Sequence, residues 1–109
     1  MTATLDDLAA LDIRVGRITT VEDFPEARNP AYKLTIDFGP LGTRRSSAQV
    51  TSYRTDELIG RDVVCVLGFP PKRVAGFVSE VLVLGALSAA DGVVLLAPDH
   101  PVDPGAPVA

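Results

Sequence analysis

The sequence has few of the residues on which disulfides, metal sites and most enzyme sites depend. It contains one cysteine, one histidine and no tryptophan among 109 residues. A single cysteine cannot form an internal disulfide, and Cys65 stands in the apolar run VVCVLGF, where a thiol is usually a small core residue. His100 has no cysteine or second histidine with which to hold a metal, so we interpret it as a solvated side chain. We therefore expect no disulfide and no metal site, which fits a reducing cytoplasm.

Long apolar runs and nucleotide-binding loops are missing as well. The first residues, MTATLDDLAALD, lack the basic segment and apolar stretch of a signal peptide, and no later run is apolar over the length of a membrane helix. No glycine-rich phosphate loop is present. The acidic pairs Asp6-Asp7 and Asp56-Glu57 fall at expected helix starts, where the helix dipole favours them without any catalytic role. We expect a cytoplasmic protein that is not an enzyme, does not insert into membranes and needs no cofactor.

Charge is distributed unevenly along the chain. The formal net charge is −4, but residues 1–26 carry −4, residues 27–78 carry +4 and residues 79–109 carry −4. The middle segment is therefore a basic island within an acidic protein. Such asymmetry indicates a localised anionic partner, while a merely solvated charged surface is the alternative.

Apolar periodicity predicts one short helix followed mainly by strands. TLDDLAAL places Leu5, Leu8 and Ala9 on one stripe behind Thr4, which can cap the helix. Gly16 interrupts the first apolar alternation and would permit a β-bulge or a tight bend, as small barrels need. The other expected elements are a short helix in TDELIG and strands in DIRVGRITTVEDF, YKLTIDF, DVVCVLGF, FVSEVLVLG and VVLLAP. This order predicts an all-β fold with short helices, namely a five-stranded OB-fold barrel with an N-terminal helix and a C-terminal extension, as one domain over residues 1–109.

The stretch RRSSAQVTSY, from Arg44 to Tyr53, combines a strand-like pattern with unusually small and polar residues. If it is extended, Ala48 and Val50 face one side, and the opposite face carries Arg45, Ser47, Gln49 and Thr51. The first face is typical of a core and the second of a binding site. Ordinary solvated sheet surface is the alternative interpretation of the polar face.

Six stretches between Asp12 and Pro98 resemble one known family. They are DIRVGRI, FPEARNPAYKLTIDFG, SSAQVT, DELIGRDVVCV, FPPKR and SEVLVLG. In this order they are similar to the CsaA-type secretion chaperones, a branch of the tRNA-binding-domain family that also includes OB-fold appendages of methionyl- and phenylalanyl-tRNA synthetases. The resemblance implies an OB-fold homodimer that binds unfolded or export-bound polypeptides, with tRNA binding in many members of the wider family.

OB barrels bind ligands on the face around their second and third strands, which is where the polar stretch is expected. Basic side chains there can neutralise phosphates, and small polar ones leave room for a ligand backbone. Phe38, Phe69 and Phe77 could stack on bases, but each flanks an apolar strand, which is more typical of a core residue. Tyr32 and Tyr53 are therefore the better candidates for exposed aromatic contacts. The predicted ligand-binding residues are Arg28, Asn29, Tyr32, Lys33, Arg44, Arg45, Ser46, Ser47, Gln49, Tyr53, Lys72, Arg73, Ser79 and Glu80.

Glu80 bears on which ligand binds. The tRNA-binding branch carries Ser-Gln-Gly-Met where this chain has SEVL from Ser79 to Leu82, and a carboxylate beside basic residues repels phosphate. The same carboxylate could accept hydrogen bonds from a peptide, or could simply pair with a neighbouring arginine. Two functions stay open: a chaperone whose partners are unfolded or precursor polypeptides, and a tRNA-binding protein that uses the same basic groove.

Apolar residues near both ends of the chain predict a homodimer. The predicted interface residues are Leu5, Leu8, Ala9, Val102 and Val108. Together they would expose more apolar surface than is usual for a small monomeric barrel, and a second subunit would bury that surface. The family resemblance implies the same assembly.

Overall fold

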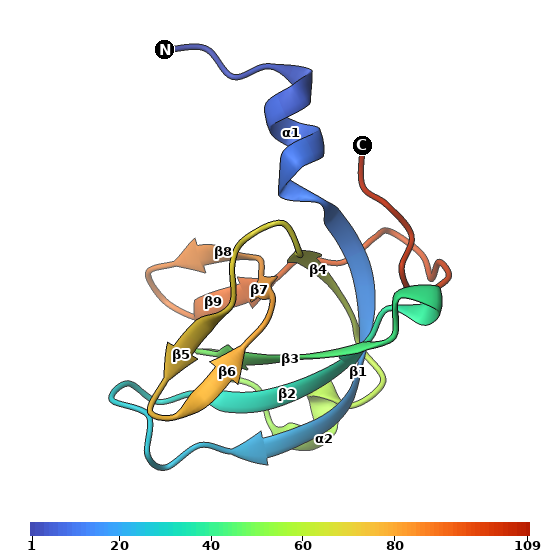
Figure 1. The fold of residues 1–109 in the computed structure, drawn as a ribbon. Helices are drawn as coiled ribbons and strands as arrows, with labels where there is room; N and C mark the ends of the chain where they lie inside the picture. The colour runs from blue at the N-terminus through green and yellow to red at the C-terminus, as the bar shows by residue number, and fades with distance from the viewer.

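The computed structural model describes residues 1–109 and consists mostly of β-strands (Figure 1). Five strands form one antiparallel sheet in the order β3-β2-β1-β4-β7. The sheet curls until β3 approaches the segment before β7, where the Glu80 main-chain N–H donates to the Arg45 carbonyl at 2.7 Å. The strands are β1 (Ile13–Asp23), β2 (Tyr32–Asp37), β3 (Thr43–Ala48), β4 (Asp62–Val66) and β7 (Leu82–Val83). The predicted five-stranded OB-type barrel is confirmed.

Two small hairpins and short helices complete the fold. The hairpins are β5 (Lys72–Val74) with β6 (Phe77–Ser79), and β8 (Gly85–Ser88) with β9 (Gly92–Leu95). The helices are α1 (Leu5–Leu11), α2 (Thr55–Leu58) and a 3-10 turn, η1 (Gly39–Leu41). The stretch FVSEVLVLG, predicted as one strand, is divided between β6, β7 and the start of β8, because Glu80 leaves β6 to bond to β3. None of the helices has the length and apolar character needed to cross a membrane.

Gly16 provides space in the core and does not form the predicted β-bulge. It pairs regularly with Val63 of β4, and the irregular register in β1 lies between Ile18 and Thr20. A Cβ atom at Gly16 would lie 2.5 Å from Ile36 Cγ2 and 2.7 Å from the Phe38 ring. The bulge that Gly16 would permit is therefore not at Gly16, because this glycine serves close packing in the core.

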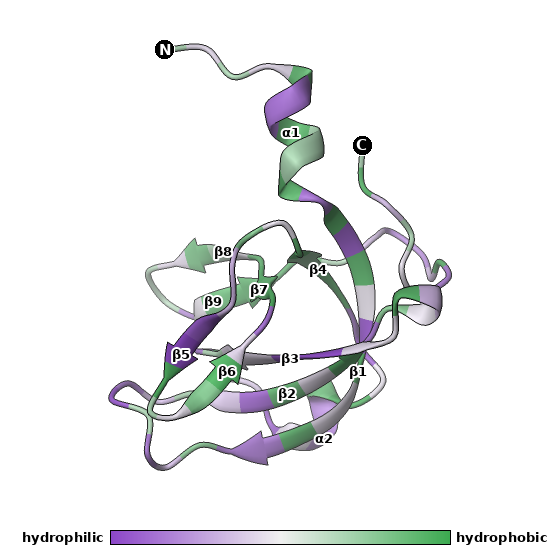
Figure 2. Ribbon diagram, viewed as in Figure 1, coloured by the Kyte–Doolittle hydropathy of each residue, from purple (hydrophilic) through white to green (hydrophobic).

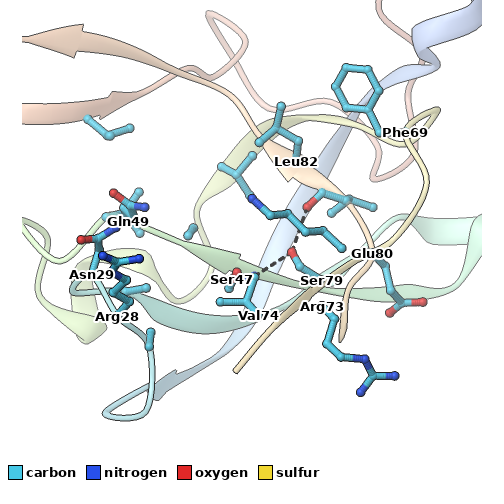
Figure 3. Close-up of a pocket in the computed structure, with 18 of the residues that line it drawn as sticks. Arg28, Asn29, Ser47, Gln49, Phe69, Arg73, Val74, Ser79, Glu80 and Leu82 are labelled. Atoms are coloured by element: carbon cyan, nitrogen blue, oxygen red, sulfur yellow. Dashed lines mark hydrogen bonds between the residues drawn. The ribbon is translucent and has the colours of Figure 1, made fainter. Parts of the chain in front are cut away.

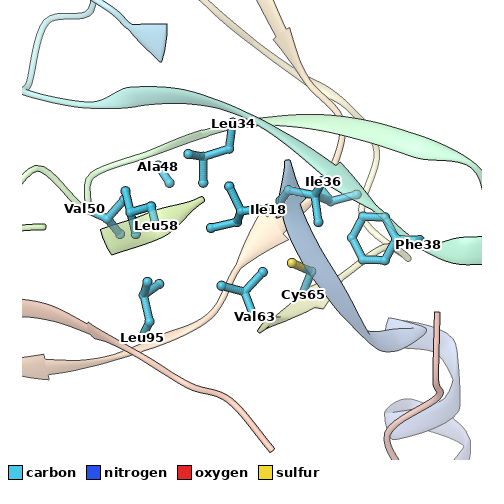
Figure 4. Close-up of a cluster of buried hydrophobic side chains, with 11 residues drawn as sticks. Ile18, Leu34, Ile36, Phe38, Ala48, Val50, Leu58, Val63, Cys65 and Leu95 are labelled. Atoms are coloured by element: carbon cyan, nitrogen blue, oxygen red, sulfur yellow. The ribbon is translucent and has the colours of Figure 1, made fainter. Parts of the chain in front are cut away.

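The core fills the interior of the barrel (Figure 4). Its eleven buried residues are Ile18, Leu34, Ile36, Phe38, Ala48, Val50, Leu58, Val63, Cys65, Val81 and Leu95. Ala48 and Val50 lie in it, as the alternation in the polar stretch predicts. Phe38 and Phe77 are buried as expected, but Phe69 is 47% exposed, so its assignment to the core was wrong. Burial raises the pKa of the Cys65 thiol from 9.0 to about 12, which leaves it protonated and unreactive at neutral pH.

Helix α1 projects from the barrel and buries none of its residues (Figure 1). Its start is the predicted one, since the Thr4 hydroxyl accepts the Asp7 N–H at 3.2 Å and the Asp7 carboxylate accepts the Thr4 N–H at 2.8 Å. The C-terminal extension pairs with β1, where Val108 N–H donates to the Ile13 carbonyl at 2.8 Å. Both ends of the chain therefore reach the same side of the barrel.

Candidate ligand-binding groove

A groove of about 850 Å³ opens where β3 and the β6–β7 segment separate (Figure 3). Its floor is the end of β3 and the residues that follow it, Ser47–Val50. The loop between β1 and β2 closes one end, and the β5–β6 hairpin and β7 form the walls. The groove therefore lies beside the second and third strands, the face expected for an OB barrel.

Eight of the predicted ligand-binding residues line this groove. In Figure 3, Arg28, Asn29 and Gln49 gather at one end, while Arg73 and Glu80 lie at the other. Ser47 and Ser79 meet between them, with the Ser47 N–H donating to Ser79 Oγ at 3.0 Å. The complete set is Arg28, Asn29, Ser47, Gln49, Lys72, Arg73, Ser79 and Glu80. The fold brings these residues together from segments that are far apart in the sequence.

The groove cations differ from most of the other basic side chains in having no carboxylate partner. Arg28, Lys72 and Arg73 line the groove and form no ion pair. Arg73 makes only a 3.5 Å contact with the Gly76 carbonyl. By contrast, Arg45 donates to Glu22 at 2.7 Å. The groove therefore holds three cations whose charge no carboxylate of the protein neutralises.

Glu80 fixes the edge of the barrel. Its carboxylate accepts the Arg45 main-chain N–H at 2.9 Å, while the Arg45 guanidinium bonds to Glu22. The ion pair with an arginine, which was the alternative role for Glu80, is not formed: Glu80 bonds to the main chain of Arg45, and the Arg45 guanidinium pairs with Glu22. One carboxylate oxygen is engaged in closing β3 against the chain that follows β6, and the side chain still lines the groove.

Ser46 is in the core and cannot contact a ligand, so its assignment to the site was wrong. It is 1% exposed, and its hydroxyl donates to the Val81 carbonyl at 2.8 Å. The physical reason is strand parity, because Ser46 shares its face with Ala48 and Val50. Its hydroxyl is tolerated there because it has a hydrogen-bond partner.

The two tyrosines are held against the core, so the expectation that they are exposed was also wrong. Tyr32 and Tyr53 are half-buried and pack on the core cluster. The Tyr32 hydroxyl donates to the Tyr53 carbonyl at 2.9 Å, and the Tyr53 hydroxyl accepts the Leu95 N–H at 3.1 Å. Each polar tip thus satisfies a main-chain group inside the fold.

Three predicted basic residues lie outside the groove. Lys33 Nζ sits 4.8 Å from the centre of the Phe24 ring, and the Arg45 guanidinium sits 4.7 Å from that of Phe77. Arg44 contacts the Leu41 carbonyl at 3.5 Å. Lys33 and Arg45 lie on the outer face of the sheet against aromatic rings, while Arg44, which has the strand parity of Ser46, contacts the main chain of η1.

Sequence reasoning missed the apolar wall of the groove. Phe69 and Leu82 are each 47% exposed and line it together with Val74, Val83 and Val93. The sequence does carry a signal for Phe69, because Pro70 and Pro71 end the strand directly after it. The sequence carries no such signal for the other wall residues, because they lie in apolar stretches typical of buried strands.

Comparison with known proteins identifies the family. The model of the family described as "Putative tRNA binding domain" matches residues 13–107. Methionine–tRNA ligase of Methanococcoides burtonii is 34% identical over 103 residues, and that of Pyrococcus abyssi is 36% identical over 108 residues. These alignments cover 94% and 99% of the chain but only 15% of each ligase.

Solved structures match over the full length. The CsaA chaperone protein from Picrophilus torridus is 52% identical with a TM-score of 0.93, covering 99% of this chain and 100% of its own. Chaperone CsaA from Bacillus anthracis str. Ames is 50% identical with a TM-score of 0.93, covering 100% of both chains. A MetRS-related protein from Pyrococcus horikoshii, 23% identical with a TM-score of 0.85 over 99% of this chain and 98% of its own, shares the fold. The chain belongs to the putative tRNA-binding-domain family and, within it, to the CsaA-type branch.

Proposed function

We propose that the protein is a non-enzymatic chaperone that binds unfolded or precursor polypeptides in the groove, acting as a homodimer in the cytoplasm with residues 1–109 as one domain. The observation that carries this proposal is the composition of the groove. An exposed apolar wall containing Phe69 and Leu82 faces a floor of small polar residues, including Ser47 and Gln49. Unfolded polypeptides present apolar side chains on a polar main chain, so both surfaces have a counterpart in the ligand.

The similarity to two CsaA chaperones at 50–52% identity over the full chain supports the same function. The groove also has the size of a ligand site, at about 850 Å³. A catalytic role has no comparable support, because Cys65 is buried and the acidic pairs lie at helix starts. Binding is therefore the activity that we propose for this surface.

The direct test uses a fluorescently labelled client protein whose cysteines have been reduced and carboxymethylated so that it cannot refold. Its binding to the chaperone is measured by fluorescence anisotropy. Leu82→Ser and Phe69→Ser should each weaken binding at least fivefold, because each removes apolar surface from the wall. Ile59→Ser is the matched control, since Ile59 is 54% exposed but does not line the groove. Equal losses in all three variants, or no binding by the wild type, would contradict the proposal.

A second function, tRNA binding, is favoured by a different observation. Arg28, Lys72 and Arg73 line the groove and have no carboxylate partner. Phosphate contacts require such free cations. The family description also names tRNA binding. Titration of a tRNA transcript into the same protein preparation tests this function, and displacement of labelled polypeptide by the transcript would indicate a shared groove.

The homodimer is proposed from the surface between α1 and the C-terminal extension. Leu5 is 83% exposed, and it lines a shallow hollow of about 380 Å³ together with Leu8, Ala9 and Val108. Val102, the fifth predicted interface residue, is half-buried and lies outside this hollow. A projecting helix with an apolar stripe and no buried residue is stabilised by docking on a second subunit (Figure 2).

Sedimentation equilibrium at micromolar concentration tests the dimer. The double substitution Leu5→Asp and Leu8→Asp should give a monomer, because each carboxylate would have to be buried without a partner. Ile59→Asp, on an exposed apolar residue outside the hollow, should remain dimeric. A monomeric wild type, or a dimeric double variant, would contradict this interface.

A further inference from the structure

The outer edge of β3 is closed along its first half by the chain that follows β6. The Arg45 N–H donates to the Glu80 carboxylate at 2.9 Å, and the Arg45 carbonyl accepts the Glu80 N–H at 2.7 Å. The Ser47 N–H donates to Ser79 Oγ at 3.0 Å. Side chains thus satisfy two amides that a neighbouring strand would normally pair with.

The second half of the same edge is open. The N–H and carbonyl of Gln49 form no hydrogen bond within the protein. The Ser47 carbonyl has only a 3.5 Å contact with the Ser46 hydroxyl, whose single proton is directed to the Val81 carbonyl at 2.8 Å. Because main-chain groups alternate along an extended segment, these free groups lie on the edge that Arg45 and Ser47 share. Ser47 and Gln49 both line the groove, so the open edge faces the groove.

We propose that an extended polypeptide binds by adding as a strand to β3 at Ser47 to Gln49, filling the position that the barrel leaves open beside β7. This inference rests on the proposed chaperone function and specifies how the ligand is held. Main-chain hydrogen bonds to Ser47 and Gln49 supply affinity that is independent of ligand sequence, as a binder of many unfolded chains requires. Apolar side chains of the added strand lie against Leu82 and Val74.

The positive charge of the groove indicates which polypeptide segments bind best. Arg28 lies beside Gln49 at one end of the groove, and Lys72 and Arg73 line the groove as well. None of the three has a carboxylate partner. The preferred segment is therefore an apolar, extended stretch flanked by an acidic residue. A nucleic acid would use the same cations but has no row of main-chain amides to pair with Ser47 and Gln49.

The test is a backbone scan of fluorescein-labelled nonapeptides with valine at alternate positions. Two versions, with a pair of aspartates at either the amino or the carboxyl end, allow for both strand directions. Each main-chain amide is N-methylated in turn, which removes one donor and leaves the side chain in place. Strand addition predicts that N-methylation at alternate amides, over a window of three to five residues, lowers the affinity of the nonapeptide at least about tenfold. N-methylation of the amides in between should change the affinity by less than about twofold.

Variants of Gln49 test the protein side. Gln49→Ala removes only the side chain, whereas Gln49→Pro removes the side chain and the main-chain N–H donor, so strand addition predicts that Gln49→Pro binds the nonapeptide about tenfold more weakly than Gln49→Ala does. Their urea-unfolding transitions show whether both are folded. Independently of any variant, hydrogen exchange of the wild-type Gln49 amide should slow when the nonapeptide binds.

The outcomes separate this inference from the proposed function. Strand addition is overturned if the nonapeptide binds but loses affinity equally when successive amides are methylated, or if hydrogen exchange of the Gln49 amide is unchanged on binding. Either result leaves the chaperone proposal standing. If carboxymethylated protein and both nonapeptides fail to bind, the function and the inference fall together. Binding of a tRNA transcript alone would also overturn both.

Discussion

The groove cations allow the tRNA-binding function to be tested quantitatively. Arg28, Lys72 and Arg73 are the basic groove residues without a carboxylate partner. If each contacts one phosphate of a duplex stem, the log-log slope of affinity against salt is about −2.7, and affinity falls about 40-fold between 50 and 200 mM salt. Arg73→Gln should reduce the slope to about −1.8 and the fall to about 12-fold. The polypeptide ligand, held by main-chain bonds and apolar contacts, should respond much less to salt.

Two controls isolate the contribution of the groove. Arg45 carries the same charge but donates to Glu22 at 2.7 Å, so Arg45→Gln should change the slope by much less than Arg73→Gln does. Arg54, paired with Asp56 and not lining the groove, provides the second control through Arg54→Gln. Each variant is titrated with a fluorescent tRNA transcript at four salt concentrations. A flat response of the wild type, or equal slope changes in all three variants, would refute the phosphate-contact argument.

Three further predictions concern the fold. Gly16→Ala should lower the free energy of unfolding by about 1–3 kcal/mol, since its Cβ overlaps core atoms; an unchanged urea midpoint would show that the core has room. Tyr53→Phe should cost about 1–3 kcal/mol, because the Leu95 N–H loses its acceptor, and equal midpoints would mean that water replaces the hydroxyl. The raised pKa of Cys65 means that the unfolded thiol ionises first, so stability falls between about pH 9 and 12; urea titrations of Cys65→Ala should lack this decline, and parallel curves would contradict it.

Residue alternation predicted the polar half of the site well. Placing Ala48 and Val50 on one face of the extended stretch correctly put them in the core, and Ser47 and Gln49 line the groove on the other side. The same rule, applied strictly, would have removed Ser46 from the site, because it shares the parity of Ala48. The family resemblance, not the alternation, is what identified the CsaA-type branch.

The apolar wall of the groove could not be predicted from the local sequence pattern. Val83 and Leu82 look like members of a buried strand, and only the division between β6 and β7 leaves them on the groove. That division depends on the bond between Glu80 and Arg45, 35 residues apart. Tyr53 was likewise misjudged because its partner, the Leu95 amide, is 42 residues away. Contacts of this kind are set by the tertiary fold and leave no periodic signal.

The position of Glu80 changes what its charge says about the ligand. From the sequence, a carboxylate beside basic residues argues against phosphate binding. In the structure, one of its oxygens accepts the Arg45 main-chain N–H at 2.9 Å, so the side chain is held at the barrel edge. Arg28 and Gln49 lie at the opposite end of the groove from Glu80 (Figure 3). Because a glutamine could accept the same hydrogen bond, the residue at position 80 serves barrel closure in either form. Glu80 therefore keeps its negative charge at the Arg73 end of the groove, where it opposes phosphate, while Arg28 and the open edge at Gln49 lie at the other end.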